Sequence, residues 1–155
     1  MITLFYTCVV KDRKPILTKE DKDFVKVIED SAEYFSRMPG FLLHALSIMP
    51  NHVHMLFSLN ELELDFDRKF RSFTTKEILR QNKTRPQPKQ IDFSSSYSDR
   101  TSTVWRKRSY IITVRDMEGY YSRINYIKNN HLQDFWLDVA YDQSFDNIEF
   151  KPRIW

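Results

Sequence analysis

The sequence contains few of the residues on which several common kinds of site depend. Its 155 residues include one cysteine, Cys8, and only two glycines. A single cysteine excludes an internal disulfide and a metal site built from cysteines. It is also typical of a reducing compartment, so we expect the protein in the cytoplasm. The scarcity of glycine argues against a glycine-rich phosphate loop and a dinucleotide-binding fold.

Long apolar runs are missing as well. No uninterrupted apolar stretch approaches the ~18 residues that suggest a membrane span. The first ten residues, MITLFYTCVV, are apolar only briefly and have no basic leader before them. We therefore expect neither a signal peptide nor a membrane partner. The length is that of a single domain, which we predict to span residues 1–155.

Positive charge is concentrated in the middle of the chain. Residues 1–80 hold twelve Lys/Arg and twelve Asp/Glu, whereas residues 81–131 hold ten Lys/Arg against four Asp/Glu. A polyanion is the natural partner of such a segment. A solvated basic face is an equally common explanation of the charge taken alone.

The hydrophobic pattern predicts an alternation of strands and helices. Alternating or continuous apolar runs rich in β-branched and aromatic residues predict strands over residues 2–10, 41–49, 52–59 and 108–114. Helical spacing of apolar residues predicts helices over residues 19–38, 65–80 and 116–133. Pro50-Asn51 joins the second and third strands as a hairpin turn, and Asp116 is the expected N-cap of the last helix.

The order of these elements predicts an α+β fold. A ferredoxin-like arrangement, similar to RRM and palm domains, accommodates it as a four-stranded antiparallel sheet with helices packed on one face. Residues 81–103 hold few apolar residues and no period, and they are expected to form a long irregular loop. This fold hosts many functions, so the function has to be argued from the site.

His52 and His54 are the most informative residues of the sequence. Side chains alternate along a strand, so both imidazoles project from one face with Val53 on the other. Two neighbouring imidazoles suit a shared divalent metal ion. Taken alone, such a pair is more often structural than catalytic.

His44 provides a comparison for the pair. With the turn at Pro50-Asn51, Met49 opposes His52 and Ser47 opposes His54. Because side chains alternate along a strand, His44 then projects from the opposite face and should point away from the pair. We interpret it as a packed histidine rather than a metal ligand.

The segment MPNHVHMLF (49–57) resembles the HUH motif of the single-tyrosine transposases, in particular the group of REP-associated tyrosine transposases. FRSFTTKEI (70–78), VWRKRSYIITVRD (104–116) and INYIKNN (124–130) are similar to segments that follow in that family, in the same order. The last of them matches the pattern Tyr-Ile-x-x-Asn of the nucleophile helix. The resemblance covers most of the chain from Met49 to Asn130.

This resemblance implies an enzyme that nicks and rejoins single-stranded DNA through a 5′-phosphotyrosine intermediate. Tyr126 matches the nucleophile, and Asn130 matches a third metal ligand beside His52 and His54. The implied ion is Mg²⁺ or Mn²⁺, the implied partner is single-stranded DNA, including hairpin-forming DNA, and a homodimer is compatible with the family. Helical spacing agrees, because Arg123, Tyr126 and Asn130 share one stripe of the last helix.

The two other tyrosines of that helix have different surroundings on a helical projection. Tyr120 falls on the apolar stripe with Ile124 and Ile127, and Tyr121 lies about 180° around from Asn130. Basic and aromatic residues near the motifs are expected to contact DNA. They are Arg123, Trp105, Arg106, Lys107, Arg108, Lys83 and Arg85.

Two other function classes compete with this interpretation. A non-catalytic or domesticated RRM-like nucleic-acid-binding protein would present aromatic residues on its central strands, where this sequence has histidines. Metal dependence distinguishes it, since a pure binder should ignore a chelator. A histidine-based nucleotide hydrolase needs a further histidine at set spacing, whereas Met55, Leu56 and Phe57 follow His54.

Overall fold

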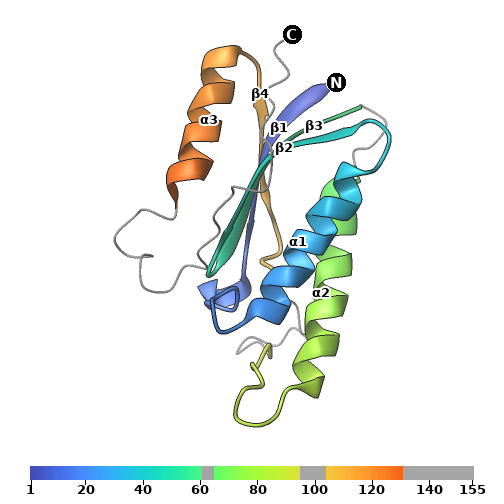
Figure 1. The fold of residues 1–155 in the computed structure, drawn as a ribbon, viewed down its shortest axis with the longest axis vertical. Coiled ribbons are helices and arrows are strands. Elements are labelled where there is room, and N and C mark those ends of the chain that lie inside the picture. Colours follow the sequence, from blue (N-terminus) through green and yellow to red (C-terminus); the bar gives the residue numbers. More distant parts are fainter. Residues whose placement is uncertain (61–64, 95–103, 131–155) are drawn as a thin grey trace.

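The computed structural model describes residues 1–60, 65–94 and 104–130, and Figure 1 shows their course. Within these residues, four strands, three α-helices and one short 3-10 helix follow each other. They are β1 (Ile2–Val9), η1 (Lys11–Arg13), α1 (Lys22–Ser36), β2 (Phe41–Met49), β3 (His52–Leu59), α2 (Phe66–Thr84), β4 (Tyr110–Val114) and α3 (Met117–Asn129). Each predicted strand and helix is therefore present, with ends shifted by a few residues.

The four strands form one antiparallel sheet in the order β2-β3-β1-β4. This is the ferredoxin-like order, which confirms the predicted fold class. The hairpin turn also lies where it was expected, because Met49 pairs with His52 and Ser47 pairs with His54. Strand β1 lies between β3 and β4, so residues from the beginning of the chain stand beside the histidine strand.

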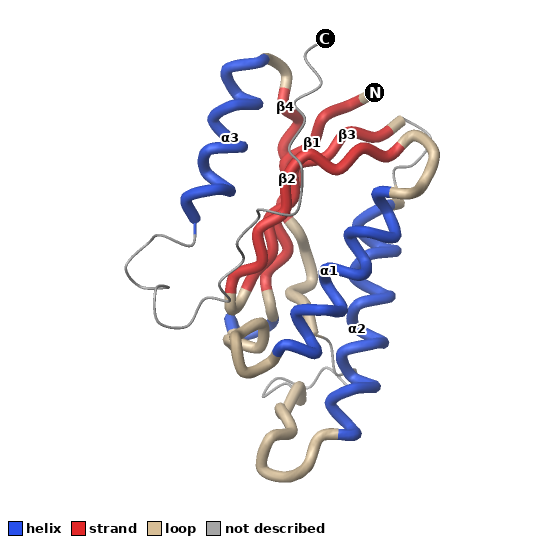
Figure 2. The backbone as a smooth tube through the Cα atoms, viewed as in Figure 1, coloured by secondary structure: helices blue, strands red, loops and turns tan. Residues whose placement is uncertain are grey.

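The helices lie on both faces of the sheet, whereas we expected them on one. Helices α1 and α2 cover one face, and α3 covers the other, as Figure 2 shows. The physical reason is that β2 and β3 carry apolar residues on both faces. Phe5, Ala45 and Leu56 are buried under Ile124 and Ile127 of α3. No described helix is long and apolar enough to cross a membrane.

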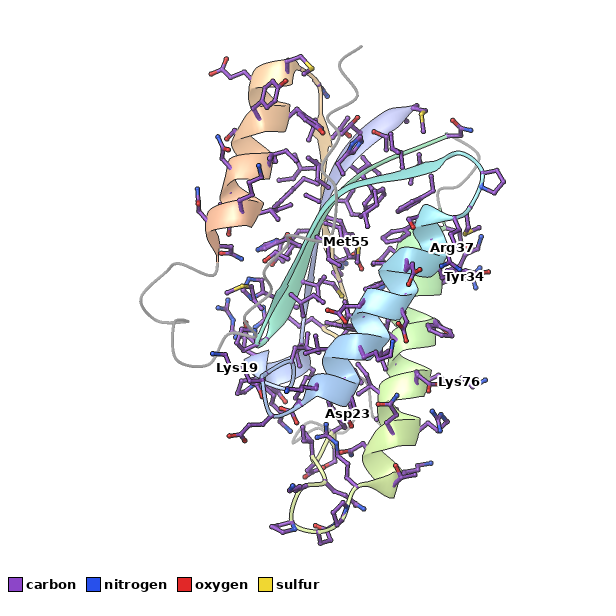
Figure 3. All side chains as sticks on the ribbon, viewed as in Figure 1. Lys19, Asp23, Tyr34, Arg37, Met55 and Lys76 are labelled. Atoms are coloured by element: carbon purple, nitrogen blue, oxygen red, sulfur yellow. The ribbon has the colours of Figure 1, made fainter. Side chains whose placement is uncertain are left out.

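The larger core lies between the sheet and α1 and α2. Aromatic rings dominate it, and Phe66 alone packs within 5.3 Å of the ring centres of Tyr6, Phe41 and Phe57. Figure 3 places Met55 of β3 inside this layer, whereas Tyr34 lies on the outer side of α1. A well-packed layer of this kind holds β3 rigidly from behind the histidine face.

The predicted loop over residues 81–103 begins later than expected, because α2 continues to Thr84. The side chain of Asn82 exchanges two hydrogen bonds with the backbone of Ile91, which folds the chain back along the helix end. Phe93 packs on Phe24 of α1. The described part of the loop is therefore tied to the helical layer, and residues 95–103 lie outside the described part.

The start of α3 generates the first prediction. The Asp116 carboxylate accepts a hydrogen bond from the Gly119 backbone N–H at 2.7 Å, as expected of an N-cap. Asp116→Ala should lower the free energy of unfolding by about 1 kcal/mol, because it leaves that N–H without its cap. Asp116→Asn, which can still cap, should stay close to wild type. Urea unfolding of the three proteins checks this, and equal stability of the Ala variant would contradict the capping role.

Candidate metal and nucleophile site

Four of the predicted site residues meet on the α3 face of the sheet. The rings of His52 and His54 lie 4.7 Å apart, centre to centre. Tyr126 of α3 lies edge-on to His54, with ring centres 5.2 Å apart. The Asn130 amide nitrogen lies 3.4 Å from His52 Nε2. Residues from β3 and from the end of α3 thus form one cluster.

Hydrogen bonds from neighbouring side chains orient both imidazoles. His52 Nδ1 lies 2.7 Å from Asn51 Oδ1, and an amide oxygen can only accept, so Nδ1–H donates. In neutral His52 the lone pair is therefore on Nε2, which faces Asn130. His54 Nδ1 lies 2.8 Å from the Thr7 hydroxyl on β1. Such partners on the far ring nitrogen are typical of histidines that bind a metal.

His54 Nε2 is the most unusual atom of the site. It is buried and has no hydrogen-bond partner among the described residues, and the whole side chain is only 5% exposed. A buried nitrogen without a partner costs about 1–3 kcal/mol. A metal ion bound at Nε2 would remove that cost, so the residues present fit a metal site.

Burial also keeps both histidines neutral. It lowers the pKa of His52 to about 4, with a further contribution from the Arg13 charge. Burial lowers the pKa of His54 to about 3, assisted by the neighbouring His52 and by Arg123. Only a neutral imidazole has a lone pair for a metal, and the neutral form is the one that burial favours at neutral pH.

Asn130 is the remaining candidate ligand. Within the described ranges, no group of three or more His, Cys, Asp or Glu side chains is arranged to hold a metal ion. Asn130 is 2% exposed and directed at His52. The atom that faces His52 is the amide nitrogen, and a half-turn of the amide group would bring its oxygen there. An amide oxygen beside two imidazoles is a donor set that Mg²⁺ or Mn²⁺ can accept.

The three tyrosines of α3 differ as the helical projection predicts. Tyr126 is 42% exposed and contacts both His54 and Phe5. Tyr120 is half-buried and packs against His44. Tyr121 is 46% exposed and packs on Tyr120. Tyr126 therefore lies against the histidine pair, whereas Tyr120 contacts His44 and Tyr121 contacts Tyr120.

The orientation predicted for His44 is wrong. Its side chain lies on the same face as the pair, where Nε2 bonds Ser58 at 2.7 Å and Nδ1 lies 3.3 Å from the Tyr120 hydroxyl. The cause is an irregularity between Leu43 and Ala45, which inserts one residue into β2 and reverses the parity beyond it. His44 is nevertheless a packed histidine, because both ring nitrogens are engaged away from His52 and His54.

Two residues expected to contact DNA have structural roles instead. Trp105 is 3% exposed, and its indole N–H donates to Thr74 Oγ1 of α2 at 2.8 Å. Arg85 forms ion pairs with Asp21 and Asp23 and lies 3.6 Å from the centre of the Phe24 ring. The first side chain is buried and the second is paired with carboxylates, so both contribute to the packing of the fold.

The other predicted basic residues remain accessible at several places. Arg106 and Lys107 line an open groove of about 740 Å³ between α2 and the segment before β4. One acidic residue, Asp12, also lines it. The remaining cations of the groove are Lys11, Arg68, Arg71 and Lys76. Arg108 is exposed before β4, and Lys83 is exposed at the end of α2.

Several residues near the site were not predicted from the sequence. Thr7 orients His54 through a hydrogen bond. The Phe5 ring contacts the rings of His54 and Tyr126, and the Arg123 guanidinium lies 4.7 Å from the centre of the Phe5 ring. Arg13 stands close enough to lower the pKa of His52. The alternation of β1 could have placed Phe5 and Thr7 on one face, but only the register with β3 shows which histidine they meet.

Comparison with known proteins gives concordant matches. Residues 3–130 match the family described as Transposase IS200 like. A curated protein of Haemophilus influenzae, named as a REP-associated tyrosine transposase, is 24% identical over an alignment 160 residues long, which covers 97% of this chain and 85% of the relative.

Two solved structures share the fold. One is a REP-associated tyrosine transposase bound to a REP hairpin, with a TM-score of 0.59 and 20% identity over 88% of this chain and 70% of that one. The other is a transposase from Deinococcus radiodurans, with a TM-score of 0.53 and 19% identity over 84% of this chain and 92% of that one.

The lowered histidine pKa values generate the second prediction. In the unfolded chain each histidine titrates near its ordinary pKa of about 6.5, so below that pH the unfolded state binds more protons than the folded state. The free energy of unfolding of the metal-free protein should therefore fall as the pH falls from 7 to 4, with His54 contributing on the order of 3 kcal/mol. Urea unfolding at a series of pH values checks it. His54→Gln should flatten the slope, and an unchanged slope would contradict a buried neutral His54.

Proposed function

This chain belongs to the IS200-like transposase family, and we propose that it nicks and rejoins single-stranded DNA through a covalent bond to Tyr126. The observation that carries the proposal is the contact between Tyr126 and His54, with the unpartnered, buried His54 Nε2 beside them. A tyrosine that is 42% exposed beside two neutral imidazoles can serve as the nucleophile of a metal-assisted phosphodiester transfer.

His52, His54 and Asn130 would hold a divalent cation, for which we propose Mg²⁺ or Mn²⁺. Such an ion, when bound, polarises the scissile phosphate and offsets its negative charge. The protein contributes the orientation of the ligands. Asn51 and Thr7 fix the two imidazole rings, and the end of α3 delivers Asn130.

Tyr126 would carry out the transfer. Its phenolic oxygen loses its proton and forms a bond to phosphorus, while the bond from phosphorus to the 3′ oxygen breaks and that oxygen leaves as a 3′-hydroxyl. The DNA is then held as a 5′-phosphotyrosine ester. Attack by a 3′-hydroxyl reverses the step and releases Tyr126, so rejoining needs no other source of energy.

The substrate we propose is single-stranded DNA that carries a hairpin. The structural neighbour solved with a REP hairpin supports this partner. The basic groove between α2 and the segment before β4 is suited to the phosphates of a duplex stem. Lys11 and Asp12 of η1 line the groove, and the next residue, Arg13, is close enough to His52 to lower its pKa.

The third prediction separates the metal ligands from DNA affinity. His54→Ala should abolish nicking in Mn²⁺ and Mg²⁺ but leave DNA binding largely intact, because affinity comes from basic residues elsewhere. A hairpin oligonucleotide with randomised single-stranded flanks is the probe, and gel analysis of cleavage with a binding titration is the measurement. Wild-type cleavage that is unaffected by chelator would favour a different mechanism, and full cleavage by His54→Ala would remove this site from consideration.

The fourth prediction concerns the nucleophile. Tyr126→Phe removes one oxygen and should eliminate the covalent protein–DNA adduct while folding and DNA binding persist. Tyr121→Phe is the matched control, because Tyr121 lies on the same helix and is similarly exposed. This substitution should leave adduct formation nearly unchanged.

The label position tests the polarity of the same adduct. A 5′-phosphotyrosine retains the DNA on the 3′ side of the cut, so a 3′ label should migrate with the protein on a denaturing gel and a 5′ label should be released. An adduct formed by Tyr126→Phe, or one that retains the 5′ label, contradicts the proposal.

A further inference from the structure

Half of the site face is left open by α3. The helix packs on β2 and β3, and its buried residues Ile124 and Ile127 lie against Ala45, Leu56 and Phe5. Strand β4 stands at the other side of the sheet and hydrogen-bonds to β1. The helix thus leaves most of β4 uncovered on this face.

Two large apolar side chains are exposed on that open half. Tyr110 is 62% exposed and Ile112 is 46% exposed, although both belong to a strand. Directly paired residues share a face of the sheet, and Tyr110 pairs with Thr7 while Ile112 pairs with Phe5. Both side chains therefore stand on the face of the histidine pair and Tyr126.

The register joins Tyr110 to the metal site in a single row across the sheet. Tyr110 pairs with Thr7, and Thr7 pairs with His54 and hydrogen-bonds to its ring. With strands ~4.8 Å apart, the backbone at Tyr110 is about 10 Å from that at His54. A stacked strand advances about 3.4 Å per nucleotide, so this distance corresponds to about three nucleotides.

The charge around this surface favours a nucleic acid over a protein partner. Residues 104–115 contain four basic residues and no acidic one. Arg108 and Arg115 flank β4 and are exposed, and the Arg123 guanidinium lies over Phe5 in the neighbouring row. Exposed aromatic rings between cations are typical of surfaces that bind unpaired nucleotides.

We infer that Tyr110 and Ile112 form a stacking platform for the unpaired bases that flank the cleaved phosphodiester. The inference rests on the proposed function for its ligand, single-stranded DNA. The DNA would run from the His54–Tyr126 contact across β1 to β4, with its phosphates near Arg123 and Arg108. Sheets of RRM domains bind bases on aromatic side chains in a comparable way.

Equilibrium binding tests the platform without any cleavage. All proteins carry Tyr126→Phe, and the probes are labelled dT20 and an abasic 20-mer with the same number of phosphates. Tyr110→Thr keeps a strand-forming residue but removes the ring, and it should bind dT20 about 5- to 100-fold more weakly. Tyr110→Phe should restore dT20 binding, and the abasic probe should bind Tyr110→Thr as it binds the parent protein.

Two further measurements separate stacking from other causes. Tyr34→Thr is the matched control, since Tyr34 is 65% exposed on the outer side of α1 (Figure 3) and should leave dT20 binding unchanged. Tyr110→Thr should not alter the dependence of log K on log salt, whereas Arg108→Gln should reduce its slope by about 0.7.

The inference fails if Tyr110→Thr binds dT20 as tightly as the parent, or if it loses the same factor with the abasic probe. It also fails if the substitution dissociates a dimer in sedimentation, because the face would then contact a second copy. Higher dT20 affinity in Tyr110→Thr would equally contradict it. If the wild-type protein forms the Tyr126 adduct but dT20 binding does not depend on the Tyr110 ring, only the platform is overturned. If dT20 binding depends on the ring but the wild-type protein forms no adduct, only the proposed enzyme activity is overturned.

Discussion

Strand β1 hydrogen-bonds to β3 along one side and to β4 along the other, and this double ladder decides which side chains surround the histidine pair. It places Thr7 against His54 on one side and against Tyr110 on the other. A slip of one residue would turn Thr7 to the opposite face and bring Tyr6 or Cys8 toward His54. The ring of His54 would then lose the Thr7 hydroxyl group that orients it, even if the helices kept their positions.

A half-buried polar network holds the same strand from behind. The Asp67 carboxylate accepts hydrogen bonds from Tyr6 of β1, from Ser109 before β4 and from Arg71. Arg71 also donates to the backbone carbonyls of Arg106 and Lys107, at 3.0 Å each. Burial and Asp67 raise the pKa of Tyr6 far above its ordinary value, so this tyrosine stays a hydrogen-bond donor. The network thereby sets the position at which the chain enters β4.

Local patterns were enough to place the histidine pair, because a hairpin with a two-residue turn fixes its own register. They were also enough for the stripe that joins Tyr126 to Asn130, since helical spacing depends only on the sequence nearby. The inserted residue near His44, the burial of Trp105 and the ion pairs of Arg85 depend on segments far apart in the chain. For the same reason the sequence did not predict a helix on the second face of the sheet. Helix α3 covers apolar residues of strands that lie more than sixty residues earlier in the chain.

The direction of α3 has an electrostatic consequence at the histidine pair. The helix ends at Asn129, and Asn130 follows it directly against His52. The aligned peptide dipoles of a helix place roughly half a negative charge at its carboxyl end. This field favours a cation over an anion beside the two neutral imidazoles. Under the proposed function, a metal ion bound there would therefore have to precede the phosphate of the DNA, because it would offset the negative end of the helix.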